Sequence, residues 1–274
     1  MSHCLILQHD DTFGPGRLIR VFRDFGVPTV TRKMHVDNEL DPDELDETRV
    51  LVLLGGTGRV GGVEDDYGKS LPSLQAEVDV VKQFVEADRP VIGFGLGAQI
   101  LALAAGAEVR PITVDEDGDG RPDAHLGWNP ITLPFPGGTD PILFGFGDGA
   151  PMFFWQRDTF TLPKLPPPTG YDPDKPGPPP PTGNALLSST RWDKNAAFRF
   201  KNRLYGFAYQ PELDAESVLA LLESQRGAVG AAHGSGAYDR AIAETHKHRD
   251  RFDRLGDRLI GQYIQFLHAY DPPM

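Results

Sequence analysis

The segment VIGFGLGAQILALAAGAEV, at residues 91–109, constrains the fold more than any other part of the chain. Its first residues form a short apolar run typical of a buried strand, and the remainder predicts an apolar helix. Gly93, Gly95 and Gly97 allow a sharp turn between the two and close packing of helix on strand. Such a turn lifts its apex residue above the sheet and directs helix amides toward developing negative charge. The apex residue is Gly95, which offers no side chain for chemistry.

Strand and helix signals alternate along the first half of the chain. Residues 4–9 and 49–56 are continuous apolar runs, which indicate strands covered on both faces of a parallel sheet. A helix is expected at 17–26, a strand at 28–35, and an amphipathic helix with Leu74, Val78, Val81 and Val85 on one face. This order predicts an α/β fold with a mixed, mainly parallel sheet.

The second half is richer in strand signals and contains two insertions. Strands are expected within 126–134, 152–156, 185–189, 196–200 and 204–211, and helices from residue 215 and from about 237 to 270. Residues 164–184 are rich in proline and predict an exposed, polyproline-like loop, either a tolerated surface insertion or a docking motif. Residues 115–123 form an acidic loop. We expect one domain over 1–274 that carries both insertions.

The charge and the cysteine content exclude several classes of protein. The net charge is −12 and the pI is about 5.1, so nucleic acid and anionic membranes are not expected partners. No apolar run reaches the roughly 20 residues of a membrane span, and no secretory pattern is visible. Cys4 is the single cysteine, which excludes an internal disulfide, and it is expected to be a small buried hydrophobe. A cytoplasmic protein is predicted.

Several motifs together resemble the class I glutamine amidotransferases, especially stand-alone members similar to the glutaminase domain of GMP synthetase. The turn PVIGFGLGAQ at 90–99 looks like the family's P-V-x-G-I-C-x-G-x-Q. Further segments look like its G-G-P, E-I-G-W, W-H-G-D-T-F-x-L-P, N-Q-A-F-R and G-x-Q-F-H-P-E motifs, and they lie at 51–60, 125–133, 155–163, 195–199 and 204–214. The resemblance implies an open three-layer, flavodoxin-like sandwich.

The resemblance also implies where a catalytic triad would lie. In the family a cysteine attacks the side-chain amide of glutamine, a histidine shuttles the proton and a glutamate orients the histidine. Here the nucleophile position is Gly95, the histidine position is Gln210, and only the glutamate, Glu212, remains. Glycine supplies no nucleophile and glutamine no acid or base near neutral pH. A chain that lacks glutaminase activity is therefore expected.

The binding pocket implied by the resemblance is partly kept. The two oxyanion amides fall at Leu96 and near Gly56, and Gln99 keeps the glutamine that ends the turn motif. Gln156 stands where the family has histidine, and Ala196 stands where it has glutamine. The turn is thus either only a scaffold or the wall of a pocket that still binds glutamine or a related small molecule.

Three roles follow for such a chain. It is a small-molecule-binding regulator, an interaction protein that docks onto a synthetase-type partner or a second copy, or an enzyme with reassigned residues. His125, Asp158 and Glu212 are available for acid–base chemistry in the last case, although each taken singly is more typical of structural hydrogen bonding. No cofactor is required by any of the three.

The acidic loop DEDGDGRPD has a spacing that suits calcium. Asp115, Asp117, Asp119 and Asp123 alternate around Gly120, and calcium takes six to eight oxygen ligands. The spacing resembles the calcium loops of thrombospondin type 3 repeats, whereas the twelfth position, which is glutamate in an EF-hand, is Leu126. The other interpretation is a solvated acidic insertion between two strands.

Overall fold

The structure is a computed structural model that describes residues 3–37, 39–61, 71, 73–112, 124–167 and 182–270. The acidic loop with Asp115, Asp117, Asp119 and Asp123 and most of the proline-rich segment lie outside these residues, so the predictions for them remain untested. Among the described residues, no helix is long and apolar enough to cross a membrane.

A seven-stranded sheet forms the centre of the molecule, in the order β2-β1-β3-β4-β11-β10-β9. Its strands are β1 (His3–Gln8), β2 (Thr29–Lys33), β3 (Thr48–Leu53), β4 (Val91–Phe94), β9 (Asn184–Ser188), β10 (Ala197–Phe200) and β11 (Leu204–Phe207). Only β10 runs against the other strands of this sheet. The apolar runs predicted as strands are buried in β1, β3 and β4, as expected for a sheet covered on both faces.

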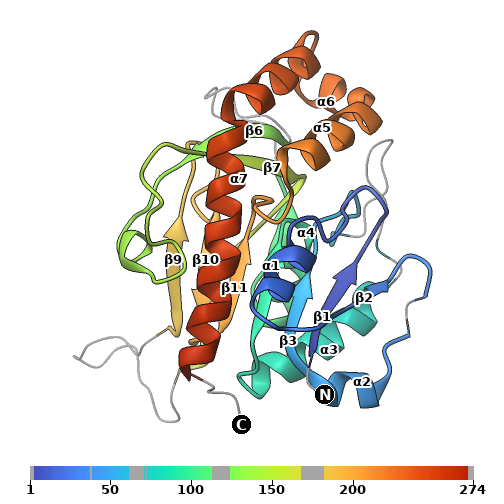
Figure 1. Cartoon of the computed structure of the whole chain (residues 1–274), viewed down its shortest axis with the longest axis vertical. Coiled ribbons are helices and arrows are strands. Elements are labelled where there is room, and N and C mark those ends of the chain that lie inside the picture. Colours follow the sequence, from blue (N-terminus) through green and yellow to red (C-terminus); the bar gives the residue numbers. More distant parts are fainter. Residues whose placement is uncertain are drawn as a thin grey trace.

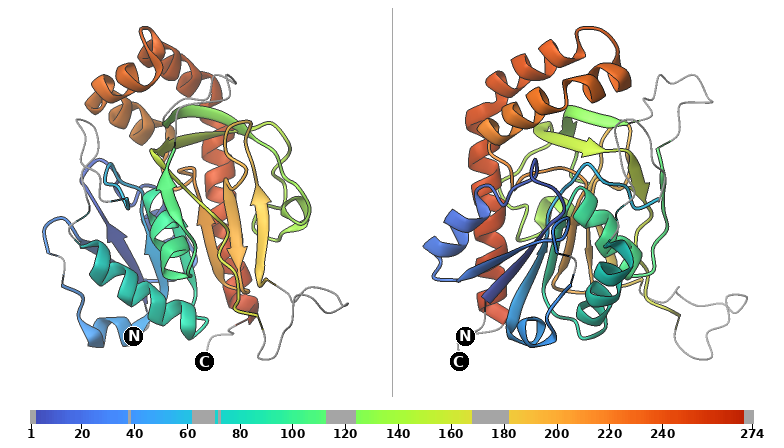
Figure 2. Two further views of the ribbon diagram at one scale, coloured as in Figure 1. Left: turned by 180° about the vertical axis from the view of Figure 1, so that it is seen from behind. Right: turned by 90° about the vertical axis from the view of Figure 1, so that its right-hand side faces the viewer.

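Helices cover both faces of the central sheet and give a three-layer sandwich (Figure 1, Figure 2). Helices α3 (Leu74–Glu86) and α4 (Leu96–Ala104) pack together on one face. Helix α1 (Leu18–Asp24) and the 34-residue α7 (Ala237–Tyr270) cover the other. The short α2 (Pro42–Glu47) precedes β3. Asp41 caps its amino-terminal end, because the Asp41 side chain accepts a hydrogen bond from the amide of Asp43.

Smaller elements extend one end of the sandwich. An antiparallel pair joins β6 (His125–Ile131) to β7 (Ala150–Gln156), and a second pair joins β5 (Val109–Pro111) to β8 (Asp158–Phe160). A 3₁₀ turn at Gly137–Thr139 lies between β6 and β7. Helices α5 (Ala215–Ser224) and α6 (Arg226–His233) lie beyond the β6–β7 pair, next to the start of α7 (Figure 1).

The predicted α/β class and the mixed, mainly parallel sheet are confirmed. The prediction for Cys4 is also confirmed, because its side chain is fully buried in β1. The strand expected at 126–134 pairs with β7 in a separate sheet, and in the described chain its other edge is bridged only at Thr132, which pairs with Ser189. This edge lies beside the first turns of α7.

Candidate functional site

The turn between β4 and α4 places Gly95 at the carboxyl edge of the central sheet. Its φ of 49° and ψ of −112° lie where only glycine is unstrained. The amide of Gly95 donates to the carbonyl of Phe207 at 2.7 Å, so the turn is fixed to β11. A β-carbon on Gly97 would lie 2.2 Å from the carbonyl oxygen of Leu53. The turn therefore packs so closely on β3 and β11 that it is part of the scaffold.

Gln210 follows β11 and points its side chain at the turn. The main-chain amide of Gln210 donates to the carbonyl of Phe153 at 2.9 Å, and the residue is fully buried. The side-chain nitrogen lies 1.9 Å from the point that a β-carbon on Gly95 would occupy, and the side-chain oxygen lies 2.5 Å from the equivalent point on Gly55. Gln210 thus fills the space that a nucleophilic side chain would need.

Glu212 is fully buried two residues further along the chain. Within the described ranges, the carboxyl oxygens of Glu212 and the side-chain amide atoms of Gln210 have no hydrogen-bond partner. Burial raises the pKa of the Glu212 carboxyl to about 8, while the Arg17 charge and nearby main-chain amides act to lower it. A carboxyl with this pKa is largely neutral at pH 7.

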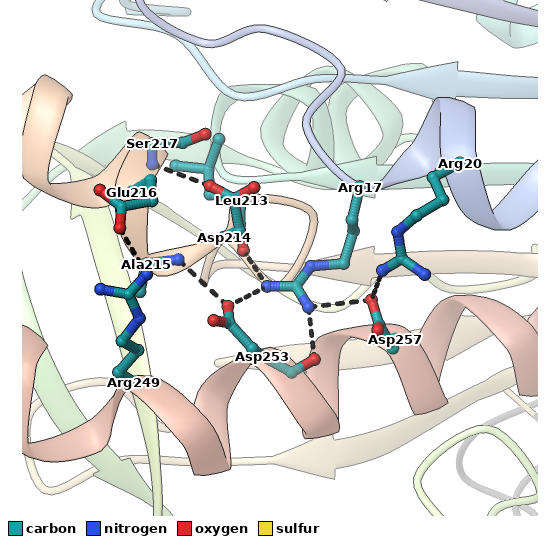
Figure 3. A network of polar contacts seen from close by, with 10 residues as sticks. All are labelled: Arg17, Arg20, Leu213, Asp214, Ala215, Glu216, Ser217, Arg249, Asp253 and Asp257. Atoms are coloured by element: carbon teal, nitrogen blue, oxygen red, sulfur yellow. Dashed lines mark hydrogen bonds and ion pairs between the residues drawn. The ribbon is translucent and has the colours of Figure 1, made fainter.

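Arg17 holds the segment that carries Gln210 and Glu212 against α7 (Figure 3). Its buried guanidinium donates to the carbonyl of Leu213 at 2.6 Å, to Asp253 at 2.7 Å and to Asp257 at 3.0 Å. Its own amide donates to the carbonyl of Glu212 at 3.2 Å. One arginine therefore links the amino-terminal turn, the segment after β11 and the last long helix.

A second buried network fixes the loop after β3, where an oxyanion amide was expected. The Nδ1 atom of His9 lies 3.2 Å from the carbonyl oxygen of Gly55, and its Nε2 atom lies 2.7 Å from Glu77. Ser73 donates to the other oxygen of Glu77. Burial acts to lower the pKa of His9, but the charge and hydrogen bond of Glu77 and the Gly55 carbonyl raise it overall. The hydrogen bond from His9 therefore fixes the orientation of the Gly55–Gly56 peptide.

The predicted pocket residues Gly56, Leu96, Gln99 and Gln156 line one cavity beside the turn. The volume that the centre of a water molecule can occupy in this cavity is only about 10 Å³. The cavity therefore holds about one water molecule. Asp158 also lines this cavity, and its buried carboxylate accepts a hydrogen bond from Nη2 of Arg59 at 2.7 Å. Gln99 donates to the main-chain carbonyl of Asp158 at 2.9 Å. The cavity is present but closed to a molecule of glutamine size.

Among the cavities described by their lining residues, none is shared by the three residues considered for acid–base chemistry. Asp158 lines the cavity beside the turn, whereas His125 lines two other cavities and lies 3.3 Å from the side-chain nitrogen of Gln156. Glu212 lines none of these three cavities. Across the described part of the chain, no group of three histidine, cysteine or acidic side chains is arranged to hold a metal ion.

Sequence reasoning missed the residues that support this site. Arg17 and Asp253 are 236 positions apart, and the pair of His9 and Glu77 spans 68 positions. The only local signal was a charged residue inside or beside an apolar segment, as for His9 after β1 and Glu77 within the buried face of α3. Such a residue is usually paired when it is buried, but the sequence does not name its partner.

Comparison with known proteins agrees with this architecture. A model of the glutamine amidotransferase class-I family matches residues 16–158, just over half of the chain. A putative glutamine amidotransferase-like protein, YfeJ from Salmonella typhimurium, is 26% identical over 239 residues, which cover 86% of each protein.

Solved structures share the fold at low sequence identity. A glutamine amidotransferase from Thermotoga maritima has a TM-score of 0.73 at 18% identity, over 96% of this chain and 98% of that one. A glutamine amidotransferase from Methylobacillus flagellatus also has a TM-score of 0.73 at 18% identity, over 97% and 95%. A putative GMP synthase subunit from Thermoplasma acidophilum has 0.55 at 18%, over 98% and 96%. Because the class-I family model matches more than half of the chain, the chain belongs to the glutamine amidotransferase class-I family.

Proposed function

We propose that this chain has no glutaminase activity and works by binding, as a regulatory or partner-interaction protein. The contact between Gly95 and Gln210 carries the proposal. At the apex of the turn there is no side chain, and the space beside it is filled by the amide nitrogen of Gln210. A nucleophile introduced from elsewhere in the chain would have to displace this buried side chain.

The chemistry of the remaining groups supports the same conclusion. Neither glycine nor glutamine attacks a carbonyl carbon or moves a proton near pH 7. Loss of one triad member alone usually lowers the rate by about a thousandfold to a millionfold. Cys4 does not replace the missing nucleophile, since it lies at the start of β1, and burial raises the pKa of its thiol far above the ordinary value. Glu212 remains, but the histidine that it would orient is replaced by Gln210, which cannot act as a general base.

The small size of the cavity beside the turn favours a role in partner interaction over glutamine sensing. About one water molecule fits there, so glutamine would require movement of lining side chains such as Leu96, Gln99 or Gln156. The partner that suits this fold is a synthetase-type protein or a second copy of the chain. One of the similar folds is described as part of a GMP synthase, which fits such a role. We place this protein in the cytoplasm.

Ammonia release from glutamine tests the loss of activity. The purified chain is incubated with excess glutamine, with the Glu212→Ala variant alongside, and we expect neither to release ammonia above the heat-denatured control. The exposed Glu86→Ala variant serves as the matched control for loss of a carboxylate. Ammonia release that Glu212→Ala abolishes and Glu86→Ala leaves intact would overturn the proposal in favour of an enzyme with reassigned residues.

Calorimetric titration with glutamine and glutamate tests the choice between the two binding roles. We expect no saturable heat at the Gly95–Gln210 site, because the cavity is closed. Micromolar binding that is lost when Leu96→Trp fills the cavity would favour the sensor role instead.

A further inference from the structure

A larger cavity lies away from the Gly95–Gln210 site, between β6 and the first turns of α7. Its free volume for water centres is about 320 Å³, within the range of small-molecule sites. Strand β6 forms one wall, and Ala237, Arg240, Ala241 and Glu244 of α7 form another. Trp192 and His233 complete the lining. In Figures 1 and 2 this region lies at the end of the molecule where β6, α6 and the start of α7 meet.

The open edge of β6 presents main-chain groups to this cavity. The amide of Leu126 donates to Nε2 of His233 at 3.2 Å, so it points away from β7. Because ladder bonds alternate along an antiparallel strand, the amide and carbonyl of Trp128 point the same way. In the described chain this edge is bridged at its far end, where Thr132 and Ser189 exchange main-chain hydrogen bonds, and no other strand pairs with it at Leu126 or Trp128. At Trp128 the edge of β6 therefore offers a main-chain donor and a main-chain acceptor, at the spacing that pairs with a peptide backbone.

Two opposite charges border the same cavity. Arg240 and Glu244 lie one turn apart on α7, both exposed, which places their β-carbons roughly 5–6 Å apart. Neither forms an ion pair with any residue that the structure describes. A ligand with one carboxylate and one ammonium group would be complementary to both.

Trp128 is held in place by a hydrogen bond and an aromatic contact, and two small side chains of α7 leave space for a ligand. The indole nitrogen of Trp128 donates to Thr245 at 2.9 Å, and its ring meets Phe252 edge-on at 4.9 Å between centroids. The small side chains of Ala237 and Ala241 face the cavity from α7. Beyond Trp192 an adjoining cavity of about 140 Å³ is lined by polar groups that include Arg110, Thr159 and Asp193. It suits a polar side chain of the ligand.

We propose that this cavity binds a dipeptide with free termini. The peptide main chain pairs with the edge of β6 at Trp128, its carboxylate lies at Arg240, its ammonium group lies at Glu244, and a polar side chain enters the adjoining cavity. The proposal goes beyond the proposed function, because it uses none of the residues of the Gly95–Gln210 contact. It gives the binding protein a ligand site that is separate from the family's catalytic site.

Nuclear magnetic resonance on the ¹⁵N-labelled full chain tests the proposal, with glycyl-glutamine as the probe. We expect saturable shifts of the Trp128 amide and of the Trp128 and Trp192 indole signals, while the Trp155 indole, which lines the closed cavity, stays unchanged. N-acetylation or C-amidation of the probe should weaken binding about twofold to fivefold, since each removes one exposed ion pair.

Matched variants on one helix locate the ligand. Arg240→Gln and Glu244→Gln should each weaken binding about twofold to fivefold and leave the fold intact, because both side chains are exposed. Arg254→Gln, which removes an exposed cation outside the cavity, should change nothing. Ala241→Leu should block binding by filling the cavity.

Three results would overturn the proposal. The first is the absence of saturable shifts at the highest soluble concentration of the probe. The second is binding that Arg240→Gln and Glu244→Gln leave unchanged. The third is equal binding of a pentapeptide blocked at both ends, which would assign the β6 edge to an internal strand of a protein partner. None of these results bears on ammonia release, so the proposed function is tested separately.

Discussion

The side-chain nitrogen of Gln210 lies 1.9 Å from the point that a β-carbon on Gly95 would occupy. The two replacements at the triad positions are therefore complementary in shape. A residue without a side chain at the turn makes room for a longer, uncharged side chain after β11. A substitution that restores a nucleophile at position 95 therefore also requires a substitution of Gln210.

The first prediction concerns this complementarity. Gly95→Ala should lower the free energy of unfolding by about 3 kcal/mol, since positive φ adds strain of about 1 kcal/mol and overpacking adds about 1–3 kcal/mol. Gly106→Ala is the matched control, because Gly106 also has positive φ but no atom within 4 Å of its β-position. It should show the backbone strain alone. Urea denaturation measures both.

Combining Gly95→Ala with Gln210→Ala separates the steric contribution. The double variant should recover most of the difference between Gly95→Ala and Gly106→Ala, because the clashing side chain is gone. Strictly additive effects in this double-mutant cycle would contradict a direct contact. The same logic predicts that Gly95→Cys is tolerated better with Gln210→His than alone.

The second prediction follows from the raised pKa of Glu212, about 8 in the folded protein. Between the ordinary glutamate pKa of about 4.3 and this value, the folded chain holds a proton that the unfolded chain has lost. The contribution of Glu212 to stability is therefore fully present below about pH 4 and falls as pH rises to about 8. The slope is at most about 1.4 kcal/mol per pH unit.

Glu212→Gln should remove this pH dependence, because its amide stays neutral. Its stability relative to the parent chain should increase between pH 5 and pH 8, whereas the exposed Glu86→Gln control should run parallel to the parent. Urea titrations at several pH values provide the measurement. A parent and a Glu212→Gln variant with parallel curves would mean that Glu212 is solvated.

Much of this fold is readable from the sequence, and the reasons are local. Strands β1, β3 and β4 contain continuous apolar runs, and the apolar period predicts helix α3. Of the face predicted for α3, Val81 and Val85 are buried, whereas Leu74 and Val78 are half-buried and the helix turns Glu77, Val80 and Phe84 inward. The positions of Gly95 and Gln210 follow from motif resemblance. Their contact does not, because it depends on how β11 and the turn approach each other in space.

The cavity at β6 was also beyond prediction from the sequence. The segment at 126–134 reads as a strand, but nothing in it shows that its outer edge has no strand partner at Leu126 and Trp128 among the described residues. Arg240 and Glu244 read as an ordinary charged face of a helix. Only the packing of α7 beside β6 places the strand edge, the two charges and Trp192 around one space.

The third prediction concerns Arg17. Its side chain is 3% exposed, whereas the partner carboxylates of Asp253 and Asp257 are 35% and 41% exposed. Arg17→Met should therefore cost about 2–4 kcal/mol, somewhat less than the loss of one partner from a fully buried pair. Arg20→Met is the matched control, since Arg20 bonds the same Asp257 but is 50% exposed. It should change the free energy of unfolding by less than about 1 kcal/mol. Equal losses in the two variants would show that Arg17 is not the main link.

The fourth prediction concerns the buried pair of His9 and Glu77, whose side chains are 1% and 0% exposed. His9→Ala leaves the Glu77 carboxylate buried without its main partner and should cost about 3–5 kcal/mol. The double variant His9→Leu with Glu77→Leu should recover most of this loss, because both polar groups are removed together. Lys33→Ala, which breaks an exposed pair with Asp11, should cost less than about 1 kcal/mol.

The pH dependence of this pair has a defined sign. The folded pKa of His9 is raised, so its stabilisation is fully present below about pH 6.5 and is lost as pH rises through the folded value. Urea titrations of the parent and of the double leucine variant check this, and the variant should lose stability less steeply above pH 6.5. A double variant that is as unstable as His9→Ala would instead mean that the pair is required to shape the Gly55–Gly56 loop, which its hydrogen bond at 3.2 Å to Gly55 reaches directly.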